Sequence, residues 1–358
     1  MKLRQLTVRF AIWIGVLILV AQTVLFVQQI AAHNDTIDLT AKNVRCIGPL
    51  AADFQCYKNH FSNVTAALGP RVALLDLKSK YATNPFVYSQ CHQLVHAIGN
   101  VVAERAVDIA DSFVDGDAIC WSGYYHGVVE RYAQIKGRDG FTMNADSLCS
   151  KISDKARFGF DYYNCVHGLG HGVMAITRGQ LFEALDLCNN LAGLWEQRSC
   201  YGGVFMENVM NDNRGHGTTF LKPENLLYPC TAVDEVFKEE CYKMQTSYAL
   251  TQNGYDFKKL FQLCASADPN HRRTCAQSIG RDASGQSISD VAKTMSSCSL
   301  GGSDEQITDC YIGAAKDFVA YHHSDVQARA LCNSIPARFK ASCESALLQQ
   351  WSTVRSVE

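Results

Sequence analysis

The sequence lacks the short motifs by which many enzymes are recognised. It has no G-x-S-x-G nucleophile elbow, no glycine-rich phosphate loop and no C-x-x-C-H haem attachment motif. It also lacks an excess of one charge, because the net charge is −2 and no Lys/Arg run exceeds two residues. Nucleic-acid binding is therefore not expected. The hydrophobic content of 47% and charged content of 19% are those of an ordinary folded protein.

The C-x-x-C spacing that usually marks structural zinc sites is also absent, although the chain has 16 cysteines. An even number of cysteines without that spacing favours disulfides, and persistent disulfides belong to oxidising compartments. Zinc ligation is the alternative interpretation. With every cysteine paired, none would remain as a nucleophile.

The N-terminal segment has the composition of a membrane anchor. Residues Phe10 to Phe26 are almost continuously apolar and follow Lys2, Arg4 and Arg9 without an intervening acid. About 17–20 apolar residues suffice to span a bilayer, whereas the apolar part of a cleavable signal peptide is usually about 7–15 residues long. An uncleaved signal anchor is predicted, with a removed signal peptide as the alternative. The basic flank places the N-terminus in the cytosol and the bulk of the chain outside, in a periplasmic, extracellular or secretory compartment.

From Cys149 to Cys343 the cysteines come in pairs at a nearly fixed interval. The pairs are Cys149/Cys165, Cys188/Cys200, Cys230/Cys241, Cys264/Cys275, Cys298/Cys310 and Cys332/Cys343. Their first members lie 39, 42, 34, 34 and 34 residues apart. A self-similar period of about 20–50 residues indicates a solenoid, and about 34 residues is the length of one helix–turn–helix unit.

Each unit is predicted to form two helices joined by a staple. The first cysteine ends helix A, a short polar connection follows, and the second cysteine begins helix B. Upstream, Cys46 and Cys56 resemble one more staple, and Cys91 is expected to bond to Cys120. Small residues recur three places after the helix-B cysteine, which predicts close approach between neighbouring helix backbones. These residues are Gly123, Gly168, Gly203, Ser278, Gly313 and Ala346.

In its period and helix–turn–helix pattern, the chain resembles tetratricopeptide-like and Sel1-like helical-hairpin solenoids over roughly residues 90–350. The resemblance is architectural and implies a curved binding surface but no catalytic residue. The expected fold is an all-α, disulfide-stapled α-solenoid behind an N-terminal transmembrane helix. The expected domains are a cytosolic tip and anchor (1–32), an irregular or helical segment (33–90) and the repeat domain (91–358).

Histidines gather in the first repeats. His92 and His96 are spaced i, i+4, as are His167 and His171, which puts both imidazoles of each pair on one helix face. Counting six places from successive helix-B cysteines gives His126, then His171, then Met206. Equivalent positions in stacked repeats point to the same side, so these side chains are predicted to form one stripe.

This stripe predicts a transition-metal site. The candidate ligands are His92, His96, His126, His167, His171 and Met206, and the candidate general bases or extra ligands are Glu130 and Glu207. Imidazole with thioether suits copper, whereas imidazole with carboxylate suits zinc or iron. Two alternatives stay open: the histidines form a non-metal ligand or catalytic site, or they only pack and hydrogen-bond between helices.

A second candidate site is the long connection from Met210 to Pro229, which interrupts the 34-residue interval. Insertions in solenoids often lie on the binding face, so Arg214 or His216 is a candidate ligand-binding residue there. A solvated surface loop is the alternative.

The sequence therefore predicts a membrane-anchored, extracytoplasmic helical-repeat protein with a histidine-rich transition-metal site. One alternative is a scaffold whose concave face binds a protein or peptide without metal, and another is a metal-dependent enzyme of unknown substrate. The expected partners are the membrane, through the N-terminal helix, and a protein or peptide on the concave face.

Overall fold

The structure, a computed structural model, describes residues 46–48, 51–113, 115–117, 119–142, 145–150, 152, 155–210, 220–287, 290–322 and 324–354. The predicted anchor at 10–26 and the loop residues Arg214 and His216 lie outside the described residues. Among the helices of the described ranges, none has the length and apolar character that crossing a bilayer requires.

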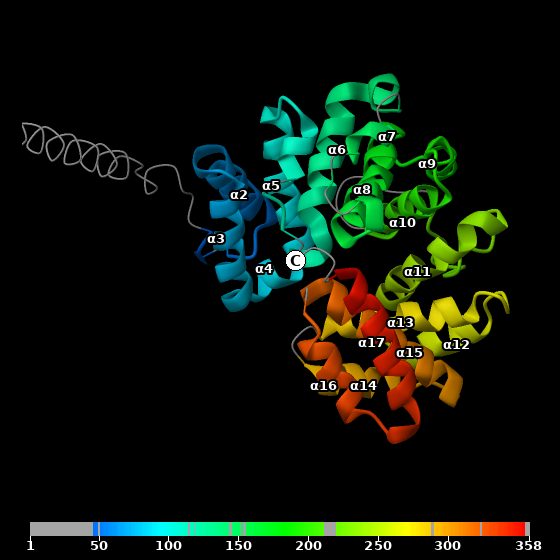
Figure 1. Cartoon of the computed structure of the whole chain (residues 1–358). Coiled ribbons are helices and arrows are strands. Elements are labelled where there is room, and N and C mark those ends of the chain that lie inside the picture. The colour runs from blue at the N-terminus through cyan, green and yellow to red at the C-terminus, as the bar shows by residue number, and fades with distance from the viewer. Residues whose placement is uncertain are drawn as a thin grey trace, which may run out of the picture.

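The described chain is built from α-helices (Figure 1). They are α2 (Phe54–Leu68), α3 (Pro70–Thr83), α4 (Pro85–Ser89), α5 (Cys91–Arg105), α6 (Ile119–Thr142), α7 (Ala145–Leu148), α8 (Phe160–Ile176), α9 (Leu181–Cys188), α10 (Leu194–Met210), α11 (Glu235–Gln252), α12 (Phe257–Ala265), α13 (Arg272–Gln286), α14 (Val291–Cys298), α15 (Asp304–His322), α16 (Val326–Ser334) and α17 (Ala337–Val354). The 3₁₀ segment Ile109–Phe113 lies between α5 and α6, and the 3₁₀ segment Lys155–Arg157 lies between α7 and α8.

The short helices show why the sequence folds this way locally. In α12, Phe257, Leu260, Phe261 and Cys264 are buried at helical spacing, so one face of the helix enters the core. The Asp256 side chain caps the first turn by accepting a hydrogen bond from the Lys259 amide at 3.1 Å.

From α8 onward, a short helix lies between most pairs of consecutive long helices. The long helices α5, α6, α8, α10, α11, α13, α15 and α17 form a row in which each contacts the next. The short helices α9, α12, α14 and α16 each pack against the two long helices that flank them in sequence. This all-α arrangement is compatible with a helical-repeat architecture.

All 16 cysteines lie in the described part of the chain and form eight disulfides. Every predicted pair is confirmed, including Cys46–Cys56 and Cys91–Cys120. Such a set is typical of proteins that fold in oxidising compartments. In the chain-entropy description each staple contributes about 3 kcal/mol to stability.

The prediction that the second cysteine begins helix B was wrong. For example, Cys200 lies well inside α10, which begins at Leu194, and Cys241 lies well inside α11, which begins at Glu235. The paired Cα atoms are 5.8 and 5.5 Å apart in these two units. A disulfide requires such proximity, and in both units the chain before the long helix lies alongside the second turn of that helix rather than its first residue.

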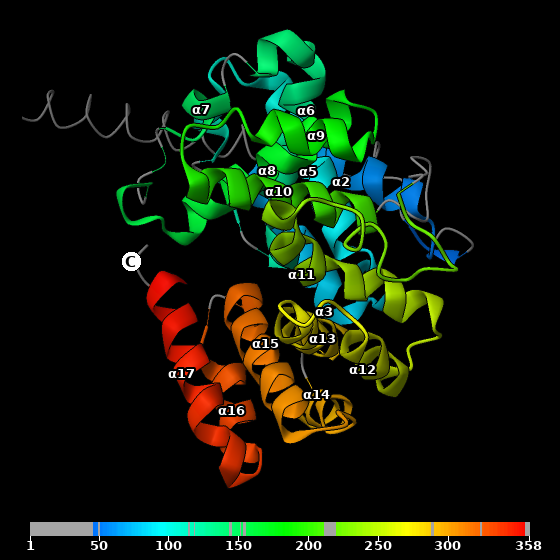
Figure 2. The same cartoon turned by 90° about the vertical axis from the view of Figure 1, so that its right-hand side faces the viewer.

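The row of helices curves until its later part meets its beginning. The Trp121 indole of α6 donates a hydrogen bond to Asp317 of α15 at 3.2 Å, and its ring lies 4.5 Å from that of Tyr321. The Tyr321 hydroxyl also donates to the Tyr81 hydroxyl of α3 at 2.6 Å. Figures 1 and 2 show the yellow-to-red helices gathered below the green ones. This curvature brings α11, α13 and α15 opposite the histidine-bearing helices.

Candidate metal centre

The five predicted histidines converge at the packing of three helices. His92 and His96 come from α5, His126 from α6, and His167 and His171 from α8. The His126 ring stacks on that of His171 at 4.3 Å and lies 5.0 Å from that of His167 and 5.2 Å from that of His92. All are buried except His96, which is half-buried. The stripe predicted from the repeat register is therefore a compact cluster.

Glycines allow the helices to come close enough for this cluster. A Cβ atom on Gly127 of α6 would lie 2.3 Å from the His96 carbonyl oxygen, and one on Gly203 of α10 would lie 1.9 Å from the His167 carbonyl oxygen. Real Cβ atoms do not approach a backbone oxygen so closely, so only glycine fits these contacts. The predicted role of small residues in close helix approach is confirmed at Gly203, whereas Gly127 lies outside the predicted set.

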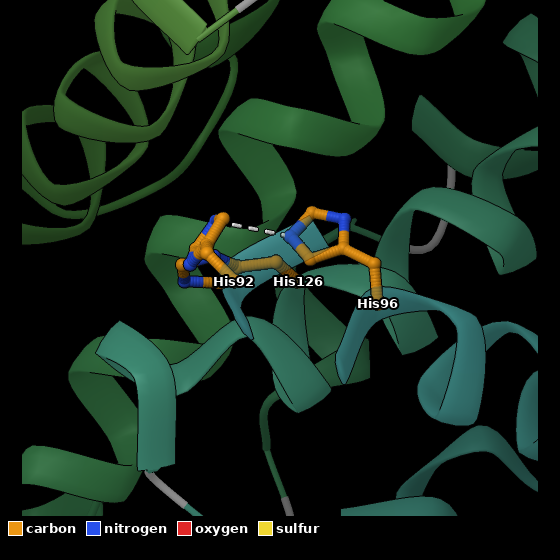
Figure 3. A group of neighbouring side chains, drawn as sticks. All are labelled: His92, His96 and His126. Carbon is orange, nitrogen blue, oxygen red and sulfur yellow. Dashed lines mark hydrogen bonds between the residues drawn. The ribbon is translucent and has the colours of Figure 1, made fainter. Parts of the chain in front are cut away.

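The first group of donors is His92, His96 and His126. The Nδ1 atom of His92 lies 2.8 Å from the Cys120 carbonyl oxygen, and Nδ1 of His96 lies 3.3 Å from Glu130 Oε2. Because both partners only accept hydrogen bonds, each Nδ1 carries the proton and each Nε2 presents a lone pair. The two Nε2 atoms face each other at 3.1 Å, along the dashed line of Figure 3.

A left-handed turn at the start of α6 supports this arrangement. Cys120, Trp121 and Ser122 have φ angles of 59°, 54° and 60°. Left-handed backbone costs roughly 1–2 kcal/mol for each residue other than glycine. The turn presents the Cys120 carbonyl to His92 and the Trp121 indole to Asp317. Strained backbone of this kind persists where the surrounding structure holds it, often at functional sites.

The second group of donors is His126, His167 and His171. The Nδ1 atom of His171 donates to Glu207 Oε2 at 2.6 Å, and His167 Nε2 lies 3.3 Å from Met206 Sδ. Within the described part of the chain, His171 Nε2 and both ring nitrogens of His126 are buried without a hydrogen-bond partner. Buried polar atoms are rarely left unpaired, so three such nitrogens in one cluster call for an explanation.

Burial favours the uncharged form of three of the five histidines. Desolvation lowers the pKa of His92, His126 and His167 well below the ordinary value, and the neighbouring histidines lower it further. For His92 the largest neighbouring contribution comes from His96, and for His126 and His167 it comes from His171. Neutral imidazole is the form that binds metal ions.

The cluster contains two groups of side chains that can hold a metal ion. In each group, one donor atom from every residue lies within 4.8 Å of the others. The groups are His92, His96 and His126, and His126, His167 and His171. Each group has a carboxylate hydrogen-bonded to the far nitrogen of one histidine, Glu130 on His96 and Glu207 on His171. Such a carboxylate orients a metal-binding imidazole and fixes its tautomer.

A cavity of about 350 Å³ adjoins the second group. His126, His167 and Met206 form part of its wall, and α11, α13 and α15 close the opposite side. Its lining is mostly apolar; the polar exceptions include Asn164, Ser247, Arg281 and Asp317. Asn164 is buried, and its Nδ2 group has no hydrogen-bond partner within the described residues.

The structure thus brings together all six predicted metal ligands and both predicted acids. Glu130 and Glu207 contact histidine Nδ1 atoms, so their geometry suits orientation of ligands more directly than proton transfer. Sequence reasoning missed Asn164 and Trp121. Asn164 immediately precedes a helix-B cysteine and shares no pattern with other repeats, and Trp121 contacts a residue 196 positions away. Neither feature has a signal in the sequence.

Comparison with protein-family models, with curated proteins and with solved structures gave no match. No family match therefore supports the likeness to tetratricopeptide-like and Sel1-like proteins. It is supported by the all-helical architecture alone.

Proposed function

We propose that this protein is a membrane-anchored, extracytoplasmic α-solenoid whose histidine cluster binds a transition metal. The observation that carries the metal assignment is the pair of facing Nε2 atoms of His92 and His96. Their Nδ1 atoms are both committed to oxygen acceptors, so two lone pairs point at each other across 3.1 Å. Two lone pairs that face each other repel unless an electrophile lies between them.

The separation suits two ligands of one ion. With metal–nitrogen bonds of about 2.0–2.1 Å, neighbouring ligand atoms lie about 2.9 Å apart at a right angle and about 3.4 Å apart in a tetrahedron. The observed 3.1 Å falls between these values. A proton shared by the two nitrogens would also relieve the repulsion, but it would leave the unpaired nitrogens of His126 and His171 unexplained.

The donor set narrows the metal. Neutral imidazoles bind copper, zinc and iron, and a thioether beside them favours copper. Met206 Sδ lies beside His167, whereas the donor group found around His92 and His96 in the described residues consists of imidazoles. We therefore propose copper or zinc as the resident metal, with iron the less favoured choice.

The disulfides and the N-terminal sequence support the proposed location. Eight disulfides favour an oxidising compartment, where such bonds form and persist. The apolar residues 10–26, with their basic flank, would hold the domain at the outer face of the membrane.

Elemental analysis of the full chain tests the metal assignment. The protein would be produced in an oxidising compartment of metal-replete cells, purified in mild detergent without a histidine tag, and compared with a His126→Ala/His171→Ala variant. We expect stoichiometric copper or zinc in the wild type and a loss of metal in the variant. His60→Gln is the matched control, since His60 pairs with Asp76 away from the cluster. A correctly folded wild type without metal would contradict the proposal.

The cavity favours a second candidate function, a metal-dependent enzyme for a small, mostly apolar molecule. The cavity wall includes donors of the second group, and the unpaired Asn164 amide can donate to a substrate oxygen. Azide is a suitable probe of a metal position that opens into this cavity. We expect azide to change the visible spectrum of the copper-loaded protein. This spectral change should be smaller in the Leu250→Trp variant, in which the larger side chain narrows the cavity. A spectrum that saturating azide leaves unchanged would argue against an enzyme and leave a peptide-binding scaffold as the better alternative.

A further inference from the structure

His126 occupies a position that no other histidine of the cluster shares. It belongs to both groups of donors, and both of its ring nitrogens are buried without a partner within the described residues. His92, His96 and His171 each commit Nδ1 to an oxygen and keep one nitrogen for a metal. A histidine that serves one ion needs only one free nitrogen, so the second free nitrogen of His126 requires its own explanation.

One ion does not account for all five histidines. Two ligand atoms on the same ion are at most about 4.2 Å apart, twice the metal–nitrogen distance. In the described residues the donor atoms come within 4.8 Å of one another only as two groups of three. The rings of His92 and His171 have centroids 6.4 Å apart, and those of His96 and His171 are 5.9 Å apart. The cluster therefore provides two coordination spheres that meet at one ring.

We propose that the cluster holds two metal ions bridged by the imidazolate of His126. His92 and His96 complete the first sphere, and His167 and His171 complete the second, with Met206 as its additional donor. This inference rests on the proposed metal-binding function. The carboxylates support it, because each sphere has one acid behind one histidine, Glu130 on the first side and Glu207 on the second.

The bridge has a defined proton balance. A neutral imidazole carries one N–H, so coordination through both nitrogens releases that proton to solvent when the second ion binds. No electron is transferred in this step. Binding of the second ion should therefore release one proton that would stay on His126 if only one of its nitrogens bound metal. Calorimetry in buffers of different ionisation enthalpy can count the protons released.

Copper provides the direct test on the full chain. We expect two Cu²⁺ ions per chain at saturation, with an integrated EPR signal well below that of two isolated ions, because an imidazolate bridge couples their spins antiferromagnetically. Replacing one of the two ions with Zn²⁺ should restore the full signal of the remaining Cu²⁺. The loss of signal and its recovery together are specific to a bridge.

Variants separate the two spheres. His96→Ala and His167→Ala should each leave one ion per chain, whereas His126→Ala should weaken binding of both. His60→Gln should keep two coupled ions. Because His126→Ala can also disturb packing, His126→Gly with added imidazole is the second variant, and we expect the free imidazole to restore two ions.

The outcomes distinguish this inference from the proposed function. Two ions without spin coupling would overturn the bridge, and one ion per chain would overturn the two-metal site while the proposed function stands. No metal in a folded wild type would overturn both. Two coupled ions in the wild type, reduced to one by His96→Ala or His167→Ala, would establish it.

Discussion

The same repeat position carries opposite chemistry in the two halves of the helical row. Six places after the helix-B cysteine, α6, α8 and α10 present His126, His171 and Met206, whereas α13 presents Arg281. In the first half, buried nitrogens are left without partners among the described residues. In the second half, Arg281 donates to Ser247 Oγ at 2.5 Å and to Asp282 Oδ1 at 2.8 Å. The same scaffold thus supports a site whose buried nitrogens have no described hydrogen-bond partner and a region whose polar groups hydrogen-bond to one another.

The satisfied region is a connected network. Asp282 also accepts hydrogen bonds from Thr246 at 2.6 Å and from Ser247 at 2.7 Å, and Thr246 contacts the Ser278 hydroxyl at 2.5 Å. A buried polar network whose members are satisfied stabilises one packing arrangement. Changes in the second half should therefore alter stability, and changes in the first half should alter metal binding.

Asp317 should give the largest effect on stability. Burial raises its pKa to about 6. The folded protein therefore holds this proton more tightly than the unfolded chain does, and this group should lower the free energy of unfolding as pH rises from about 4 to about 6, by about 3 kcal/mol in total. Asp317→Asn should remove that dependence, because an amide can hydrogen-bond to Ser284 and Trp121 without charge. Urea unfolding at pH 4 and pH 7, with disulfides intact, measures the difference.

Asp186→Asn is the control for that experiment, since Asp186 is exposed. It should keep the wild-type pH dependence. An Asp317→Asn protein with an unchanged pH dependence would show that the carboxyl group is not protonated in the fold. The metal content of the Asp317→Asn protein should equal that of the wild type.

A pair of glycine substitutions sharpens the contrast. Gly203→Ala places a Cβ 1.9 Å from the His167 carbonyl oxygen, and Gly313→Ala places one 1.8 Å from the Gln277 carbonyl oxygen. Each should destabilise the fold by about 1–3 kcal/mol, because the helices must separate. Only Gly203→Ala should lower the metal content, since it moves α10, with Met206 and Glu207, away from α8. Thermal unfolding and elemental analysis on both variants measure this, and equal metal loss in both would break the distinction between the halves.

Glu207→Gln should give the smallest change in stability. The amide oxygen can still accept from His171 Nδ1, but it no longer carries the charge that makes the imidazole a stronger ligand. We expect metal affinity to fall about tenfold to a hundredfold with the fold unchanged. Competition with a chelator of known affinity measures the change. Glu239→Gln is the control, because Glu239 bonds to Thr274 outside the cluster. Unchanged affinity in Glu207→Gln would mean that the carboxylate does not act through His171.

The repeat architecture was predictable because its signal is local. Cysteines 11 or 12 residues apart close small loops, so the pairing of Cys188 with Cys200, or of Cys264 with Cys275, follows from spacing alone. The stripe of His126, His171 and Met206 was predictable for a related reason. Side chains at equivalent positions of stacked repeats point to the same side of the solenoid. The helix starts were predicted poorly, because spacing reports which residues meet but not how far a helix extends beyond them.

The cavity was not predictable from the sequence. It depends on the curvature that brings Asp317 of α15 to Trp121 of α6, and curvature sums small rotations over many repeats. The left-handed turn at 120–122 is equally hidden, because none of its residues is glycine, the residue that usually marks such a turn.

Cys120 implies an order of assembly. Its sulfur joins α6 to α5 through Cys91, and its carbonyl holds the His92 ring in place. A newly made chain in which this bond has not formed lacks the carbonyl anchor of the proposed first coordination sphere. Maturation would then run in one direction, with thiol oxidation first and metal acquisition second. A reductant strong enough to open Cys91–Cys120 would release metal from an otherwise folded chain.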